Sequence, residues 1–234
     1  MRNCVRNILF VICCLFLMTG IMHAQDIDRK WALSYNVSPL VKPVLTNNPT
    51  GRSLGRGFEA FTVMGEYYLP EKWTAEAGYF RAEIAYGGHS RTMEGIQLGG
   101  KKYFVDPDFF LQPYAAFATQ FNWGRHYEDF HNPDGYYNSY LMKNPRLSIV
   151  PGVGAEIYMF TPIAFVVRYN FNIGIGSKTI IDTNHTSYES AYLLKDRGMY
   201  HNLELGVKIT FPMTFTDDDG YTLLTIIRDL IFNF

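Results

Sequence analysis

The sequence predicts an all-β fold: an eight-stranded antiparallel up-and-down transmembrane β-barrel with a short C-terminal amphipathic helix. Three observations predict it. Apolar and polar residues alternate with a period of two through most of the chain. The links between the alternating segments are short and long in turn. The aromatic residues, which make up 16% of the chain, gather near the ends of these segments.

Composition excludes several other classes of protein. The chain has 234 residues, a formal net charge of -1 and 47% hydrophobic residues. After residue 24, no unbroken apolar run is longer than Ile163–Val167. A membrane-spanning helix needs about 18 such residues, so a helical membrane protein is excluded. The apolar content excludes a disordered chain, and the lack of basic excess argues against nucleic acid as a partner.

Residues 1–24 have the layout of a secretory signal peptide. Arg2 and Arg6 precede the apolar stretch Ile8–Met18, and the small residue Ala24 marks the expected cleavage site. An N-terminal anchor helix is the alternative, but the stretch is short for a membrane span. All three cysteines lie in this segment, so we expect no disulfide or thiolate chemistry in the mature chain. They are Cys4, Cys13 and Cys14.

Eight segments alternate as β-strands do. The clearest is Tyr200–Phe211, where Leu203 and Leu205 share one face and Glu204 lies on the other. In Trp73–Tyr86 the phase is unclear near Tyr79, and we expect a β-bulge there. The remaining six are Trp31–Ser38, Phe61–Leu69, Glu94–Tyr103, Phe109–Trp123, Arg146–Tyr158 and Ile163–Ile173.

The links between these strands alternate in length. We expect tight turns at Leu69–Lys72, Phe104–Asp108 and Met159–Pro162. We expect long links at Pro39–Arg56, Gly87–Met93, Gly124–Pro145 and Gly174–Arg197. In outer-membrane barrels the short turns are periplasmic and the long loops extracellular. With an even number of strands, both termini are then expected on the periplasmic side.

Charged residues occupy the middle of the polar rows, which predicts a charge network inside the barrel. Small residues share these rows, as a narrow eight-stranded lumen filled by side chains requires. Arg81 and Glu83 are expected to join the network if the bulge shifts the phase of their strand. A soluble barrel would instead place these charges on its surface. The predicted network consists of Glu66, Glu76, Lys101, Glu156, Arg168, Glu204 and Lys208.

Aromatic residues at both ends of the strands favour a membrane barrel over a soluble one, because membrane barrels carry an aromatic girdle at each interface. At the short-turn end they are Tyr67, Tyr68, Trp73, Tyr103, Phe104, Phe109, Phe110, Tyr158 and Phe160. Towards the long-loop end they are Tyr35, Tyr86, Phe121, Trp123, Phe171 and Tyr200.

With these features the chain resembles the small eight-stranded outer-membrane β-barrel proteins of Gram-negative bacteria, the OmpA/OmpX/OmpW-like, porin-like group. The resemblance covers residues 25–212 and rests on the alternation, the girdles and the last strand, which ends Ile209-Thr210-Phe211. It implies insertion by the barrel assembly machinery and contact with outer-membrane lipids and lipopolysaccharide. No catalytic motif carries over, and we expect no cofactor. The residues that follow Phe211 depart from the pattern.

Residues 213–234 change period and predict an acidic linker followed by an amphipathic helix. The acidic run Asp217–Asp219 suits a helix N-terminus, and the apolar residues of Tyr221–Phe234 recur at helical spacing. The segment is too short to span a bilayer. It can plug the periplasmic mouth, lie on the membrane or dock on a periplasmic partner, and a ninth strand is a further alternative.

The sequence contains only weak candidates for metal binding or catalysis. His126, Glu128, Asp129 and His131 are residue types that ligate metals, but their spacing matches no known helical site, so we expect no metal. His89-Ser90, and His201 with Asp196, are the candidates for hydrolytic chemistry. We therefore predict a non-enzymatic protein with a structural or surface-interaction role. The alternatives are a narrow channel for small or apolar solutes, a lipid A-modifying enzyme and a subunit of an envelope secretion or transfer assembly.

Overall fold

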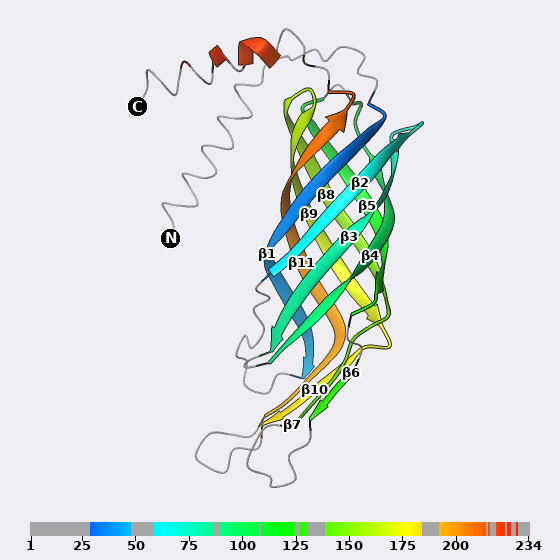
Figure 1. Cartoon of the computed structure of the whole chain (residues 1–234), viewed down its shortest axis with the longest axis vertical. Helices are drawn as coiled ribbons and strands as arrows, with labels where there is room; N and C mark the ends of the chain where they lie inside the picture. Colours follow the sequence, from blue (N-terminus) through cyan, green and yellow to red (C-terminus); the bar gives the residue numbers. More distant parts are fainter. Residues whose placement is uncertain are drawn as a thin grey trace.

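The fold is a closed antiparallel β-barrel (Figure 1). The computed structural model describes residues 29–47, 59–86, 89–107, 109–124, 127–130, 139–183, 192–213, 215, 219–222, 224–225 and 228. Each barrel strand pairs with its neighbours, and β1 also pairs with β11, which closes the barrel. The predicted fold class is confirmed. In order around the barrel the strands are β1 (Trp31–Asn47), β2 (Glu59–Leu69), β3 (Trp73–Tyr86), β4 (His89–Tyr103), β5 (Leu111–Asn122), β8 (Leu147–Phe160), β9 (Ile163–Ile175) and β11 (Tyr192–Phe211).

Side chains alternate between the outside and the inside of the barrel. On β1, Trp31 and Leu33 point outward and are 52% and 49% exposed. Ala32 and Ser34 point inward and are 0% and 2% exposed. A soluble barrel buries its apolar rows inside, whereas here large apolar side chains lie outside and charged ones inside. The predicted arrangement of the two faces is therefore present in the structure.

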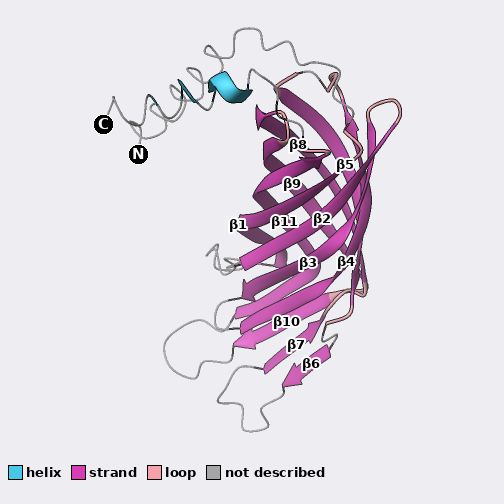
Figure 2. Cartoon of the chain, turned by 45° about the horizontal axis from the view of Figure 1, so that its top comes forward, coloured by secondary structure: helices cyan, strands magenta, loops and turns pink. Residues whose placement is uncertain are grey.

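Three shorter strands extend the sheet beyond the barrel, at the end opposite the short turns (Figure 2). They are β6 (Tyr127–Phe130), β7 (Ser139–Lys143) and β10 (Lys178–Thr183). β10 pairs with the first part of β11, β7 with β10, and β6 with β7. These strands lie within the predicted long links Gly124–Pro145 and Gly174–Arg197, where hydrogen-bonded pairing continues past the rim of the barrel.

Two other predicted long links are shorter than expected. Most of Gly87–Met93 belongs to β4, which begins at His89 and pairs with β3 from His89 to Lys102. Within Pro39–Arg56, β1 continues as a strand to residue 47. A shift in its register between Val37 and Leu40 lets the strand pass a proline, which has no N–H to donate.

The β-bulge predicted in β3 is absent, since its pairing with β2 and β4 runs without a register shift. Phe80 consequently points inward and is 3% exposed, while Arg81 and Glu83 point outward. The expectation that Arg81 and Glu83 join the interior charges was therefore wrong. An apolar cluster fills the lumen at this level instead, and it consists of Val41, Ala60, Phe80, Ala82, Ile84, Met93, Met142 and Tyr200.

The C-terminal segment begins a helix at residues 219–222, at the same end as the short turns (Figure 1). The buried carboxylate of Asp219 accepts a hydrogen bond of 2.8 Å from the backbone N–H of Thr161, in the turn between β8 and β9. Most of the predicted apolar stripe lies outside the described residues, as do residues 1–24. No helix within the described ranges is long and apolar enough to cross a membrane.

A buried ion network as the candidate functional site

Four charged side chains form a closed ring of ion pairs in the lumen. The ammonium of Lys101 lies 2.6 Å from a carboxylate oxygen of Glu66 and 3.3 Å from one of Glu156. The ammonium of Lys208 lies 2.9 Å from the other oxygen of Glu66 and 2.6 Å from the other oxygen of Glu156. All four side chains are at most 2% exposed. Each carboxylate therefore bridges both ammonium groups.

The ring draws on every second strand of the barrel. Glu66 comes from β2, Lys101 from β4, Glu156 from β8 and Lys208 from β11. In the order of strands around the barrel, β2 lies opposite β8, and β4 lies opposite β11. Negative and positive charges thus alternate around the lumen, and the ion pairs connect four strands of the barrel. Such buried groups are stable only when each charge has partners of opposite sign, as it has here.

A second connection crosses the lumen beside this ring. The guanidinium of Arg168 on β9 donates two hydrogen bonds, of 2.9 and 3.0 Å, to the two oxygens of Glu76 on β3. Its Nε donates a third, of 2.8 Å, to Asn170. Lys101 links the two clusters, since its ammonium lies 3.6 Å from Glu76. Bidentate pairing of this kind holds both side chains in a fixed geometry.

Tyrosine side chains extend the network towards the short-turn end. The hydroxyl of Tyr103 donates to Glu156 at 2.8 Å and accepts from Lys208 at 3.1 Å. The hydroxyl of Tyr158 donates to the second oxygen of Glu156 at 3.1 Å. Tyr68 is within hydrogen-bond distance of Tyr158, at 3.3 Å. Both oxygens of Glu156 therefore accept a hydrogen bond from a tyrosine hydroxyl in addition to their contacts with the ammonium groups.

All seven residues of the predicted network point into the barrel, and six are joined by ion pairs. The seventh, Glu204, is 2% exposed and accepts a hydrogen bond of 2.9 Å from Asn202. Among the described residues no ion pair includes Glu204. Buried Asn and Gln side chains also line the lumen, and the amide of Gln120 donates a hydrogen bond of 2.8 Å to the amide oxygen of Gln97.

Sequence reasoning misplaced several of the tyrosines. Tyr68, Tyr103, Tyr158 and Tyr200 were predicted in the aromatic girdles, but all four point inward. The spacing contained the signal, because Tyr103 lies two residues after Lys101 and so shares its face. Other predicted girdle residues do lie outside and are largely exposed, among them Tyr67, Trp73, Phe104 and Phe109 at the short-turn end and Tyr35, Phe121 and Trp123 towards the other end.

Of the candidates for hydrolytic chemistry, His201 and Asp196 do not meet. His201 lies on the outer face of β11, where its ring stacks on Tyr169. Asp196 points inward and pairs with Arg91 at 3.6 Å. The side chain of His89 lies outside the described residues, as do those of the potential metal ligands His126, Glu128, Asp129 and His131, for which no metal was expected. Within the described part of the chain, no group of His, Cys, Asp and Glu is arranged to hold a metal ion.

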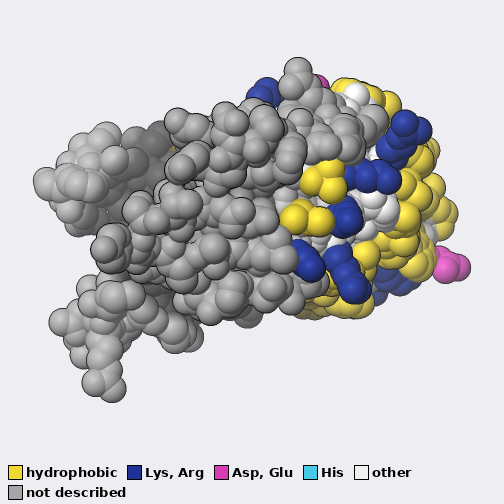
Figure 3. Space-filling model, turned by 90° about the horizontal axis from the view of Figure 1, so that it is seen from below, with side chains coloured by type: hydrophobic (Ala, Val, Ile, Leu, Met, Phe, Trp, Pro, Cys, Tyr) yellow, Lys and Arg dark blue, Asp and Glu magenta, His cyan; other side chains and the backbone are white. Residues whose placement is uncertain are grey.

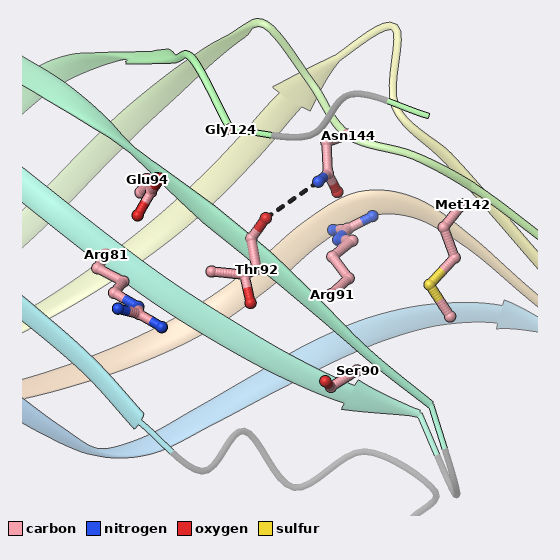
Figure 4. A pocket seen from close by; sticks show the side chains of 8 residues that line it. All are labelled: Arg81, Ser90, Arg91, Thr92, Glu94, Gly124, Met142 and Asn144. Atoms are coloured by element: carbon pink, nitrogen blue, oxygen red, sulfur yellow. Dashed lines mark hydrogen bonds between the residues drawn. The ribbon is translucent and has the colours of Figure 1, made fainter. Parts of the chain in front are cut away.

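A cavity of about 430 Å³ lies beside β4, near the sheet extension (Figure 4). Ser90 and Glu94 line it from β4 and Arg81 from β3, and Asn144 closes it by donating a hydrogen bond of 3.0 Å to the carbonyl of Thr92. None of the imidazoles that the structure describes lines this cavity.

Comparison with known proteins supports the fold. No protein-family model matches the chain, and no curated protein sequence matches it. The structure of Neisserial surface protein A is similar, with 11% sequence identity, a TM-score of 0.50 and coverage of 77% of this chain and 97% of that one.

Two further outer-membrane proteins match at lower TM-scores. OprG from Pseudomonas aeruginosa matches at 12% identity and a TM-score of 0.40, over 78% of this chain and 96% of its own. The outer membrane protease OmpT from Escherichia coli matches at 12% identity and 0.34, over 78% of this chain and 79% of its own. The closed barrel and its likeness to Neisserial surface protein A show that the chain has the fold of the small outer-membrane β-barrels.

Proposed function

We propose that this chain is a non-enzymatic outer-membrane β-barrel protein with a sealed lumen and a structural or surface-interaction role. The observation that carries the proposal is the pairing of buried charges across the lumen. The ring of Glu66, Lys101, Glu156 and Lys208, together with the Arg168–Glu76 pair, occupies the space that a solute would need. The apolar outer rows suit contact with lipid.

The proposed orientation places the short turns and both termini in the periplasm. It follows from the rule that outer-membrane barrels keep their short turns inside and their longer segments outside. The extension formed by β6, β7 and β10 is then extracellular. The proposed partners are outer-membrane lipids and lipopolysaccharide, and the barrel assembly machinery during insertion. A periplasmic protein that docks on the C-terminal helix is a further proposed partner.

An enzymatic role has less support. His201 and Asp196 lie on opposite faces of β11, so they do not form a base and its orienting acid. The cavity beside Ser90 offers arginine and glutamate side chains and no described imidazole. The residues that the structure does bring together are acids and bases already engaged with one another, as a structural network requires.

Conductance in planar lipid bilayers tests the proposal. The inserted protein, identified by its heat-modifiable mobility on a gel, is expected to pass no steady current. A Glu76→Ala/Arg168→Ala variant, which removes the contact across the lumen, is expected to pass more current than the native chain. Steady single-channel current through the native protein would overturn the sealed lumen and favour a channel.

A further inference from the structure

Exposed basic side chains gather at the long-loop end, where the sheet extension leaves the barrel. Lys143 ends β7, Lys178 begins β10, Arg197 lies on β11, and Arg146 lies between β7 and β8; all four are exposed. We call these four residues the basic face. Seen from this end, Lys and Arg side chains lie between hydrophobic ones (Figure 3).

Lys143, Lys178 and Arg197 lie around Ser177, and Arg146 precedes Leu147, which pairs with Ile175. Lys143 and Lys178 are directly opposite one another in the pairing of β7 and β10. The Ser177 hydroxyl donates to the carbonyl of Lys143 at 3.0 Å. On β11, the glycine that follows Arg197 lies so close to Ser177 that a Cβ atom there would overlap it. The basic face is therefore a compact surface.

The inner side of this region fixes the position of the strands. Arg91, which points inward from β4, donates to Thr179 at 2.9 Å and to Ser177 at 3.1 Å. It also pairs with Asp196, and both side chains are at most 1% exposed. This buried cluster joins β4, β10 and β11. The exposed cations on the outer side of these strands are therefore held by paired strands and not by a loop.

Like charges directly opposite one another on paired strands destabilise a sheet. Lys143 and Lys178 are such a pair, and an anion that binds between them would remove their repulsion. At the short-turn end the exposed charges are mixed in sign, as in the ion pair of 2.9 Å between Lys72 and Asp106. Within the described ranges no such ion pair includes a residue of the basic face, which favours an anionic ligand at the long-loop end.

The position of the basic face identifies the kind of anion. It adjoins the end of the apolar outer surface, where Phe121, Leu147 and Ile175 form one row across β5, β8 and β9. Phe121 and Ile175 are 48% and 49% exposed. Arg146 directly precedes Leu147, and Lys178 lies three residues beyond Ile175. Cations next to an apolar surface match an anionic lipid, whose headgroup and acyl chains meet at such a border.

We propose that the basic face binds the phosphate groups of a phosphorylated glycolipid of the outer leaflet, of the lipid A type. The inference rests on the proposed membrane placement. The acyl chains would lie along the row of Phe121, Leu147 and Ile175, and the phosphates would lie on Lys143, Arg146, Lys178 and Arg197. Several cations acting on one headgroup give binding that weakens as salt rises.

The test measures binding of diphosphoryl lipid A to the full chain folded in neutral detergent, with native mass spectrometry as the readout. The test variant carries Lys143→Gln, Arg146→Gln, Lys178→Gln and Arg197→Gln. The matched control carries the same number of changes elsewhere, as Lys30→Gln, Lys72→Gln, Lys102→Gln and Arg228→Gln. Heat-modifiable mobility on a gel identifies the folded barrels that enter the comparison.

The native chain and the control are expected to retain lipid A equally, and the test variant to bind it at least about tenfold more weakly. Inorganic phosphate at the same concentration is expected not to compete. Equal binding by the test variant, or an equal loss in the control, would overturn the inference. Full competition by inorganic phosphate would show a site for the free ion and would also overturn it. None of these results would affect the proposed sealed barrel, which depends on insertion and conductance.

Discussion

The guanidinium of Arg168 and the carboxylate of Glu76 join two strands on opposite sides of the barrel. Their two hydrogen bonds are 2.9 and 3.0 Å long, and both side chains are at most 2% exposed. Since β3 and β9 lie four strands apart in a ring of eight, this one pair reaches across the lumen. It is both a structural crosslink and an obstacle to passage.

Replacing Arg168 by Gln is expected to lower the free energy of unfolding by about 3–5 kcal/mol, because it leaves Glu76 buried without its bidentate partner. Urea unfolding in detergent micelles measures the change. The double variant Arg168→Leu/Glu76→Leu is expected to recover much of the loss, since no unpaired charge remains. Arg81→Gln is a matched control on the outer face. A loss in the control as large as in Arg168→Gln would contradict the account.

Gly99 is expected to tolerate no side chain. A Cβ atom there would lie 2.6 Å from the Cβ of Ala118 and 2.7 Å from the carbonyl oxygen of Phe117. Gly99→Ala should therefore lower the free energy of unfolding by about 1–3 kcal/mol through overpacking. Gly65→Ala is the control, because its Cβ would meet only the Ala77 carbonyl, at 3.6 Å. Equal stability of the two variants would show that the lumen can adjust.

Much of this arrangement could be predicted from the sequence because a strand sends alternate side chains to opposite faces. One mid-strand charge, such as Glu204 or Lys208, assigns the whole row to the lumen. The positions of Tyr68, Tyr103, Tyr158 and Tyr200 were predicted wrongly because their aromatic type was given more weight than their position in the alternating pattern. Tyr103 shares a face with Lys101 and lies inside, where its hydroxyl serves Glu156.

The sheet extension could not be predicted, because pairing beyond the barrel rim depends on strands far apart in sequence. β7 and β10 meet only because β8 and β9 bring their ends together. The first strand was also predicted to end before Pro39, but β1 continues past this residue because a register shift accommodates the proline. The apolar cluster around Phe80 is a further example, since it brings together residues of several strands far apart in sequence.

Asp219 is expected to hold the C-terminal segment against the barrel. Its carboxylate accepts the hydrogen bond from Thr161, so Asp219→Ala should release the segment and speed tryptic cleavage at Arg228. Limited proteolysis followed by mass spectrometry measures the rate. Asp106→Ala, which removes an exposed acid at the same end, is expected to leave cleavage unchanged. Unchanged cleavage in Asp219→Ala would mean that other contacts hold the segment.

The central claim, that the apolar outer rows face lipid, is tested most directly by spin labels on the outer face. Residues 25–234 contain no cysteine, so single-cysteine variants can be labelled selectively. Labels at Leu33→Cys, Phe165→Cys and Val207→Cys in lipid vesicles are expected to be accessible to oxygen and shielded from a water-soluble nickel complex. A label at Lys178→Cys should show the reverse. Equal access of the nickel complex to all four sites would contradict a membrane-spanning barrel.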